Sequence, residues 1–575
     1  MGRICHCLIL IIIGLGLIGC DQRIVEPQSR NDAMVLDYNF GTKPLLFDPV
    51  LAVEQASLDL SVQLFDNLVQ FDSESGQILP ALAEDWDISQ DGLTYTFKMR
   101  EDAIWVNQKG EPQREVTALD VVYAIKRGCD PNVASPYSYM LFGIQGCQSA
   151  HESVSQPDLE HIGVRELAPF IVEFTLNRPL AYFPTILSMP IARPVPHEVV
   201  EAYGDQWTNL EHLLTNGPFR LDEWQANDHL TLIKNPHFYE ANDVQLMQIK
   251  GHFLDDVTAS NHYLENKIDA MNVESNATRH LRSMSSINKE WTPFPEPCTY
   301  AYGFTMVKPP LDNVRVRRAL SMALDRQKLI DQVQEMQLPA RHFAPPFVFG
   351  ALPLDKGGAS LNLPMAQQLL AEAGYPAGQG FPPLFLVHPE HPVQAQLATM
   401  AAEMWLEHLG IEVIAESMPR EAYVAMIQRT TPLDEMSHIW ALGWCADYPD
   451  QHNWIYQVFN LEAEPLAEHF INRRFEERIT VYGGGEYVRR IAGRLDDLTE
   501  EAMNERDQNK RQALYQEAER ILTVEETIIA PVYHDTINTF TKPWVQRTYS
   551  YVKGQSFKKW VVDMEAKTEA LNRGQ

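Results

Sequence analysis

Residues 314–333 read VRVRRALSMALDRQKLIDQV, with apolar side chains at the spacing of an amphipathic helix. Two shorter stretches, LTYTFKMR at residues 93–100 and FIVEFTL at residues 170–176, alternate polar and apolar residues as β-strands do. A second amphipathic helix is predicted over residues 509–525, NKRQALYQEAERILTVE. The fold is therefore predicted to be mixed α/β.

The composition is that of a large and strongly acidic chain. It has 575 residues, of which 45% are hydrophobic, enough for two or three packed lobes. The formal net charge of −30 argues against nucleic acid as a partner and against charge-driven binding to anionic lipid. An acidic surface on an ordinary globular protein explains this charge, and an electrostatic preference for cationic ligands is the more specific alternative.

The first twenty residues, MGRICHCLILIIIGLGLIGC, predict export from the cytoplasm. Arg3 precedes a short apolar run, and small residues precede Cys20, as in a secretory signal. The run is shorter than the roughly 20 residues of a membrane-spanning helix. Its end, LIGC, resembles the lipobox of bacterial lipoproteins, which makes residues 1–19 a signal peptide and Cys20 the lipidated residue. An ordinary signal peptide with an incidental cysteine is the alternative.

Four cysteines lie beyond the signal, namely Cys129, Cys147, Cys298 and Cys445. In an oxidising compartment this even number predicts two disulfides, and the sequence alone leaves three pairings open. A zinc site is disfavoured, because no pair has CxxC spacing and no histidine lies beside the cysteines at ligand spacing. We expect no metal and no cofactor.

Motifs for catalysis are scarce. The sequence lacks a GxSxG element, and HEVVE at residues 197–201 lacks the second histidine of a metalloprotease helix. The glycines at 483–485 are not followed by the lysine and helix of a phosphate-binding loop, and the charged stretch 473–494 around them is predicted to be an exposed insertion. We therefore expect a protein that is not an enzyme, with an exported hydrolase as an open alternative.

Three stretches of the sequence closely resemble the oligopeptide-binding proteins of ABC importers, within extracytoplasmic solute-binding protein family 5. They are LTNGPFRLDEWQANDHLTLIKNPHFY at 214–239, CTYAYGFTMVKPPLDNVRVRRALSMALDR at 298–326 and GWCADYPD at 443–450. The last of these, together with the distant CTY, is the narrower signal for the oligopeptide branch. The resemblance implies a two-lobed periplasmic-binding-protein fold of type II, with an extra domain inserted in the first lobe, which closes on its ligand by a hinge motion.

The same resemblance gives approximate domain boundaries. Proline-rich breaks such as FPEPC at residues 294–298 are candidate crossings between lobes. The expected domains are lobe I at 31–65, 189–297 and 533–575, the extra domain at 66–188, and lobe II at 298–532.

The resemblance places the ligand at GWCADYPD. Asp447 would pair with the free α-amino group of a bound peptide, and the backbone around Gly443, Trp444 and Cys445 would bond to the peptide main chain. Main-chain hydrogen bonds supply affinity without reading side chains, which suits a receptor for many sequences. A carboxylate buried by lobe closure needs a cationic partner, because an unpaired buried charge is costly. The alternative is that Asp447 caps a helix or turn.

Further ligand contacts are implied on the opposite side of the cleft. Val53, Glu54 and Gln55 match the segment that contributes main-chain bonds from the other lobe, and Tyr137 matches a ligand-facing tyrosine. Packing at the edge of the cleft is the alternative for each of them.

Recognition of a peptide C-terminus is where the sequence departs from the oligopeptide binders of enterobacterial type. Those proteins have an arginine three positions before the motif tryptophan, and this chain has Ala441 there. Arg429 matches a second such arginine once a gap is placed, with an exposed salt bridge as the alternative. The length of the ligand and the recognition of its C-terminus are therefore left open.

The resemblance also implies the pairing of the cysteines and the function. Cys298 would pair with Cys445, and Cys129 with Cys147 would then close a short loop. We expect a lipid-anchored extracytoplasmic receptor, monomeric, that captures oligopeptides and passes them to the permease subunits of an ABC transporter. A family 5 receptor for a murein peptide, a glycan or a metal chelate is the alternative.

Overall fold

The computed structural model describes most of the chain after the predicted export signal. The predicted signal peptide and Cys20 lie outside the described residues. Within the described part, no helix has both the length and the apolar character that a membrane span requires. The described residues are 34–573 without 74–75, 154, 227, 274, 334–336, 427–435, 461–485 and 552–553.

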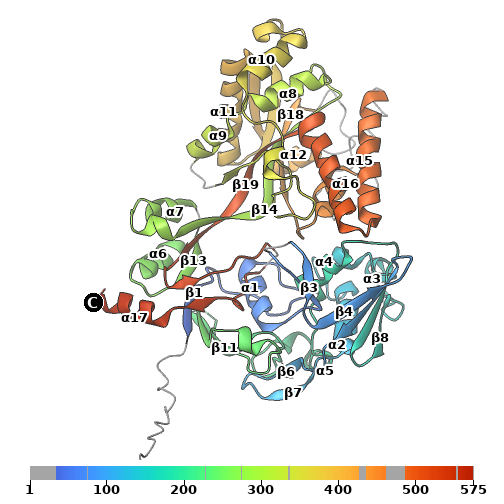
Figure 1. Cartoon of the computed structure of the whole chain (residues 1–575), viewed down its shortest axis with the longest axis vertical. Coiled ribbons are helices and arrows are strands. Elements are labelled where there is room, and N and C mark those ends of the chain that lie inside the picture. The colour runs from blue at the N-terminus through green and yellow to red at the C-terminus, as the bar shows by residue number, and fades with distance from the viewer. Residues whose placement is uncertain are drawn as a thin grey trace, which may run out of the picture. The chain divides into compact units, whose positions relative to one another are not determined.

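One large mixed sheet is the central element of the fold (Figure 1). Its strand order is β10-β11-β12-β1-β13-β19-β14-β18-β16-β17, and β15 pairs with β19 beside this path. The strands are β1 Val35–Asn39, β10 Phe219–Gln225, β11 His229–Lys234, β12 Gln248–His252, β13 Ala270–Val273, β14 Trp291–Phe304, β15 Leu338–Pro339, β16 Leu384–Pro389, β17 Val413–Met418, β18 Ile439–Cys445 and β19 Ile529–Thr541.

Two long strands, β14 and β19, connect the two ends of this sheet. They pair antiparallel with each other, while β19 also pairs with β13 and β14 also pairs with β18. Their register slips between Pro295 and Thr299. Prolines cannot donate ladder hydrogen bonds, so the sequence TPFPEPC favours such a bulge. The predicted break at residues 294–298 is thus a bulge inside one continuous strand.

A separate four-stranded sheet has the order β4-β5-β9-β8. It confirms the strands predicted at residues 93–100 and 170–176, which are β5 and β9. Three two-stranded pairs, β2-β3, β6-β7 and β20-β21, complete the strands. Their bounds are β2 Val69–Phe71, β3 Ile78–Pro80, β4 Ala83–Ile88, β5 Thr94–Met99, β6 Ile104–Val106, β7 Pro112–Glu115, β8 Val164–Ala168, β9 Ile171–Thr175, β20 Val545–Gln546 and β21 Val561–Val562.

The helix predicted over residues 314–333 is two helices. It divides into α8 (Val314–Met322) and α9 (Arg326–Val333). The carboxylate of Asp325 accepts the backbone N–H of Lys328, so the aspartate caps a new helix inside a stretch whose apolar periodicity looks continuous. The single-helix prediction was wrong at this cap.

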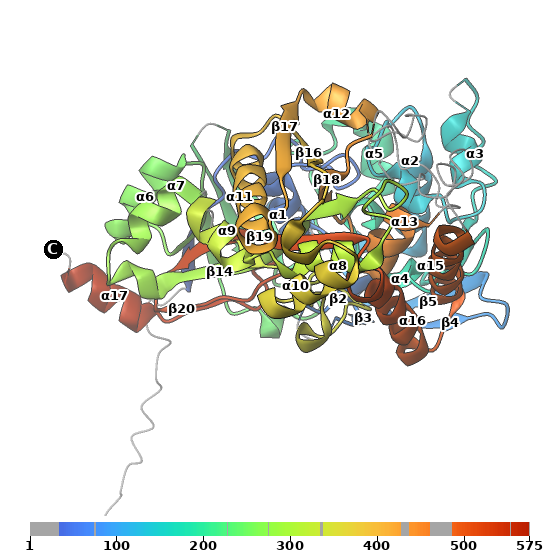
Figure 2. The ribbon, with the colours of Figure 1, turned by 90° about the horizontal axis from the view of Figure 1, so that it is seen from above.

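The helix predicted over residues 509–525 is confirmed. It is α16 (Gln508–Arg520), which continues into a π-helical turn at Ile521–Glu525. Figures 1 and 2 both show α15 (Glu486–Asn504) beside it. Of the predicted insertion, residues 473–485 lie outside the described part of the chain. Residues 486–494 begin α15, in which Ile491 is buried and the side chain of Arg494 is 45% exposed.

The remaining helices are short, apart from α11. They cover the sheets or connect strands. Their bounds are α1 Gln55–Leu64, α2 Ala118–Cys129, α3 Cys147–Glu152, α4 Phe183–Leu187, α5 His197–Tyr203, α6 Asp256–Leu264, α7 Ser275–Arg282, α10 Leu363–Glu372, α11 Pro392–Leu409, α12 Arg420–Met426, α13 Gln457–Phe459 and α17 Met564–Arg573.

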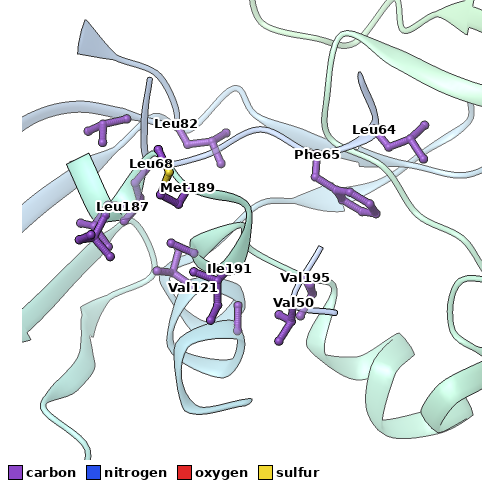
Figure 3. Packing of buried hydrophobic residues seen from close by; sticks show 14 of the residues in the cluster. Val50, Leu64, Phe65, Leu68, Leu82, Val121, Leu187, Met189, Ile191 and Val195 are labelled. Atoms are coloured by element: carbon purple, nitrogen blue, oxygen red, sulfur yellow. The ribbon is translucent and has the colours of Figure 1, made fainter. Parts of the chain in front are cut away.

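Two large hydrophobic cores hold these elements together. One gathers buried residues of β14, β16, β18 and β19 with α8, α10 and α11. The other joins β1 and α1 to the four-stranded sheet and α2. Figure 3 shows part of the second core, where Leu68, Leu82 and Met189 lie close together and Val121 of α2 lies near Ile191. Burial of such side chains stabilises a fold by about 1.5–3 kcal/mol each.

Both predicted pairs of cysteines are disulfides in the structure. Cys129 at the end of α2 is bonded to Cys147 at the start of α3. Cys298 of β14 is bonded to Cys445 of β18, directly across the ladder. The second bond attaches the GWCADYPD motif to the strand that also pairs with β19.

Candidate functional site

The end of β18 presents its backbone to open space. β18 pairs with β14 along its length but with β16 only at Ile439 and Trp440. The Cα atoms of Cys445 and Cys298 lie 4.0 Å apart, which is typical of a pair without mutual hydrogen bonds in an antiparallel ladder. The N–H and C=O groups of Cys445, and of Gly443 two residues before it, therefore point away from β14. No strand in the described ranges pairs with them there, so an extended ligand can.

Asp447 lies just beyond this open edge. Its half-buried carboxylate accepts a hydrogen bond from the hydroxyl of Tyr139, and its backbone N–H donates to Oδ1 of Asn453 at 3.1 Å. Burial and the nearby carboxylate raise the pKa of Tyr139, which keeps the hydroxyl protonated as a donor. A carboxylate held in this way beside free main-chain groups can receive the ammonium end of an extended peptide.

A buried ion pair fixes the loop that carries Asp447. Asp450 and Arg511 form two hydrogen bonds of 2.8 and 2.6 Å, and the side chain of each is 2% exposed. Oδ1 of Asp450 also accepts the backbone N–H of His452. Asp450, three residues after Asp447, thus caps the turn at His452.

A cavity of about 180 Å³ adjoins the Cys298–Cys445 disulfide. The bulge of β14, the start of α1 and the segment after β20 surround it. Of the predicted ligand residues, Val53, Gln55 and Cys445 line this cavity. Its other lining residues are Leu58, Asn272, Phe294, Pro295, Glu296, Pro297, Cys298, Ala446, Ile537, Thr539, Arg547, Tyr549, Ser550, Tyr551, Gly554 and Gln555.

The side chains of Glu54 and Trp444 contact other parts of the protein. Glu54 is the N-cap residue of α1, and its carboxylate accepts the backbone N–H of Leu45 at 2.8 Å and the hydroxyl of Ser57. Its C=O is bonded to the N–H of Leu58. The side chain of Trp444 is buried in the core of β14 and β18, so only its backbone is near the open edge.

The remaining predicted residues do not gather at the cavity. Tyr137 is half-buried at the start of the 3₁₀ turn Ser138–Leu141, and its neighbour Tyr139 is the tyrosine bonded to Asp447. Arg429 lies outside the described residues. Ala441, which stands in place of an arginine, is buried, and its C=O accepts the hydroxyl of Tyr423.

Sequence reasoning missed two residues of this region. Tyr139 lies two positions after Tyr137 in the sequence SPYSYM, and this second tyrosine was the available signal that either residue could face the site. Arg547 lines the cavity from the C-terminal segment, and no local pattern marks it.

A second group of polar side chains lies on the four-stranded-sheet side of the molecule. Asp120, His197 and Glu198 place one ligand atom each within 4.8 Å of one another. Arg114 bonds to both carboxylates, with an Nη2–Oδ1 distance of 2.7 Å to Asp120. Hydrogen bonds from Arg114 and His197 outweigh burial and lower the pKa of Asp120 to about 2. The guanidinium supplies the positive charge of this cluster.

Comparison with known proteins shows the family of the chain. The family model of bacterial extracellular solute-binding proteins, family 5, middle region, matches residues 77–463. The periplasmic oligopeptide-binding protein OppA of Salmonella typhimurium is 30% identical over 89% of this chain and 89% of its own. The probable deoxycholate-binding periplasmic protein YgiS of Escherichia coli K12 is 30% identical over 89% of this chain and 90% of its own.

Solved structures show the same fold. The murein tripeptide-binding protein MppA in its unliganded open form superposes with a TM-score of 0.78 and 26% identity, over 92% of this chain and 98% of its own. The periplasmic oligopeptide-binding protein OppAIV of Borrelia burgdorferi gives a TM-score of 0.59 at 26% identity, over 92% and 100%. The α/β fold is therefore the two-lobed type II fold of periplasmic binding proteins.

Proposed function

Because the chain belongs to the bacterial extracellular solute-binding proteins of family 5, which serve ABC importers, we propose that it captures oligopeptides and delivers them to the permease subunits of a transporter. Its relatives bind solutes rather than convert them, and they act outside the cytoplasm. Peptide as the ligand is supported by several relatives that are named as oligopeptide-binding or murein peptide-binding proteins.

The observation that carries this proposal is the open edge of β18 beside Asp447. Gly443 and Cys445 offer N–H and C=O groups that have no described partner strand, and a carboxylate follows two residues later. Every peptide has a main chain that fits the first feature, and every unmodified peptide has an ammonium group that fits the second. Recognition through these groups accepts many sequences, as an importer of mixed peptides requires.

Two further parts of the proposal concern the organisation of the chain. We assign lobe II to residues 298–532, lobe I to 31–65, 189–297 and 533–575, and the extra domain to 66–188. The hydrophobic core of β14, β16, β18 and β19 draws its residues from 300 to 533, which supports the first of these assignments. We also propose that the receptor acts as a monomer, because a single chain supplies both Asp447 and the cavity.

The ligand itself tests the function. Protein purified without denaturation is expected to carry peptides of mixed sequence with free amino termini. Native mass spectrometry would detect the complexes, and sequencing of the molecules released on unfolding would identify them. Recovery of one non-peptide solute, with no binding of a peptide pool in calorimetry, would support the alternative of a family 5 receptor for another ligand. Deoxycholate belongs in that comparison, since it is the solute in the name of YgiS.

Anchoring to the membrane is expected through Cys20. The cysteine ends the lipobox-like LIGC, and in bacterial lipoproteins such a cysteine receives the lipid. Cells fed a labelled fatty acid should label the wild-type protein and not the Cys20→Ser variant. Equal labelling of the two proteins would mean that the segment is an ordinary signal peptide.

A further inference from the structure

The cavity beside the disulfide contains a cation that none of the predicted contacts uses. Arg547 and Glu296 are the two charged side chains among its described lining residues. Arg547 directly follows β20, and Glu296 lies in the bulge of β14. In a chain with a net charge of −30, an arginine at a ligand cavity is a specific feature rather than part of a basic surface.

The guanidinium of Arg547 is held in place by neutral groups. Nη2 donates to Oδ1 of Asn272 at 2.9 Å, and Nη1 lies 3.5 Å from Oγ1 of Thr541. The guanidinium carbon also lies 4.9 Å from the ring centroid of Tyr549 and 5.0 Å from that of Trp560. These contacts orient the group without neutralising its charge.

One donor of this guanidinium has no partner. The Nε–H of Arg547 is buried and makes no hydrogen bond to the described residues, and no described carboxylate lies within ion-pair distance of the side chain. Asp59 is near enough to affect Arg547 electrostatically, but its Oδ1 accepts the side chain of Gln55 and the backbone N–H of Gln555. Buried donors are nearly always bonded, so this Nε–H is a donor that an acceptor entering the cavity would satisfy.

We propose that Arg547 recognises a carboxylate of the bound peptide, and that the receptor therefore prefers peptides with an acidic group in the part that enters the cavity. This inference rests on the proposed function. A guanidinium binds a carboxylate with two parallel charge-assisted hydrogen bonds, which makes it a stronger anchor than a neutral donor. The carboxylate can come from an acidic side chain or from the peptide C-terminus.

The rest of the cavity is compatible with such a group. Phe294, Tyr549 and Tyr551 line the cavity, with ring centroids 4.6 and 4.7 Å from Phe294 to the two tyrosines, and this aromatic cluster supplies apolar surface for the stem of the acid. Glu296 lies in the same lining, and burial with the charge of Asp535 raises its pKa to about 7. The raised pKa favours the neutral carboxyl, which opposes an incoming carboxylate less than an ionised glutamate would.

A matched set of peptides tests this proposal. Tetrapeptides of alanine with a single glutamate at each position in turn are compared with the corresponding glutamine peptides, all as C-terminal amides. Tetra-alanine is compared as free acid and as amide, which separates the C-terminal carboxylate from a side chain. Calorimetry uses the full chain after removal of co-purified ligand, in the wild type and in the variants Arg547→Gln, Arg547→Lys and Arg165→Gln. The last removes one charge at an exposed site in β8, where the side chain is 70% exposed.

The wild type should bind at least one acidic peptide about tenfold more tightly than its neutral counterpart. Arg547→Gln should lose this preference while binding the neutral peptide as before, and Arg547→Lys should keep part of it, because the charge remains and the planar fork is lost. Arg165→Gln should keep all of it. If a thermal melt shows that Arg547→Gln is unfolded, the proposal is tested by Arg547→Lys, which should lose part of the preference for acidic peptides.

Three results would overturn the inference. They are a wild type without preference, a preference that survives in Arg547→Gln, and an equal loss for acidic and neutral peptides. The absence of binding for every peptide would instead overturn the proposed function, and this result differs from the others because even the neutral peptides give no heat.

Discussion

An Arg511→Ala variant is expected to lose about 3–5 kcal/mol of the free energy of unfolding. Arg511 and Asp450 are both almost completely buried and form a bidentate pair, and the guanidinium carbon lies 4.6 Å from the ring centroid of Phe349. Removing the arginine leaves a buried carboxylate without its counter-charge, which is far more costly than the loss of an exposed pair. Urea denaturation followed by tryptophan fluorescence would measure the change.

The matched control is Arg494→Ala on the neighbouring helix α15. Its side chain is 45% exposed and lies 3.2 Å from Glu517, so the loss should be under about 1 kcal/mol. Similar small losses in both variants would show that the Asp450–Arg511 pair contributes little. Because Asp450 also caps the turn at His452, the Arg511 variant should weaken peptide binding as well, through a loosened loop around Asp447.

An Asp447→Asn variant is expected to bind peptides with free amino termini about 30-fold or more weakly. Loss of one partner of a buried charge pair typically costs roughly 2–5 kcal/mol, and each 1.4 kcal/mol is a factor of ten in affinity. The amide keeps the shape of the carboxylate and can still accept the hydroxyl of Tyr139, so the fold should be unchanged. Calorimetric titration with a peptide recovered from the purified protein would measure the loss.

A surface carboxylate provides the control for this substitution. Asp228 has a side chain that is 82% exposed, and Asp228→Asn changes the net charge by the same amount. Its peptide affinity should match that of the wild type. An equal loss in Asp228→Asn would attribute the effect to the overall charge of the protein rather than to the site.

Local patterns predicted the elements whose cause is local. The alternation at residues 93–100 and the helical spacing at 509–525 correspond to β5 and α16, because each element buries one face of its own sequence. The prediction of a single helix over residues 314–333 failed for an equally local reason. Asp325 caps a new helix within this stretch. The helical spacing of apolar residues continues on both sides of the cap, so the spacing alone does not reveal it.

The sequence predicted the candidate site only where a motif marks it. The sequence of β18 and Asp447 could be singled out from GWCADYPD, and the disulfide between Cys298 and Cys445 followed from the same resemblance. The contact between Tyr139 and Asp447 joins residues 308 positions apart, and no spacing rule reports it. Arg547 lies in a segment without a motif and comes to the cavity through the pairing of β20 with β21 and the packing of the residues that follow.

The measurement that tests the central claim most directly compares one peptide with its N-acetylated form on the wild type and on Asp447→Asn. If Asp447 anchors the ammonium group, the substitution should weaken the free peptide by about 30-fold or more and the acetylated peptide hardly at all. The acetylated peptide should also bind the wild type poorly, because it lacks the charge that the carboxylate receives. Equal losses for the two peptides would contradict the account and leave Asp447 as a structural partner of Tyr139 and Asn453.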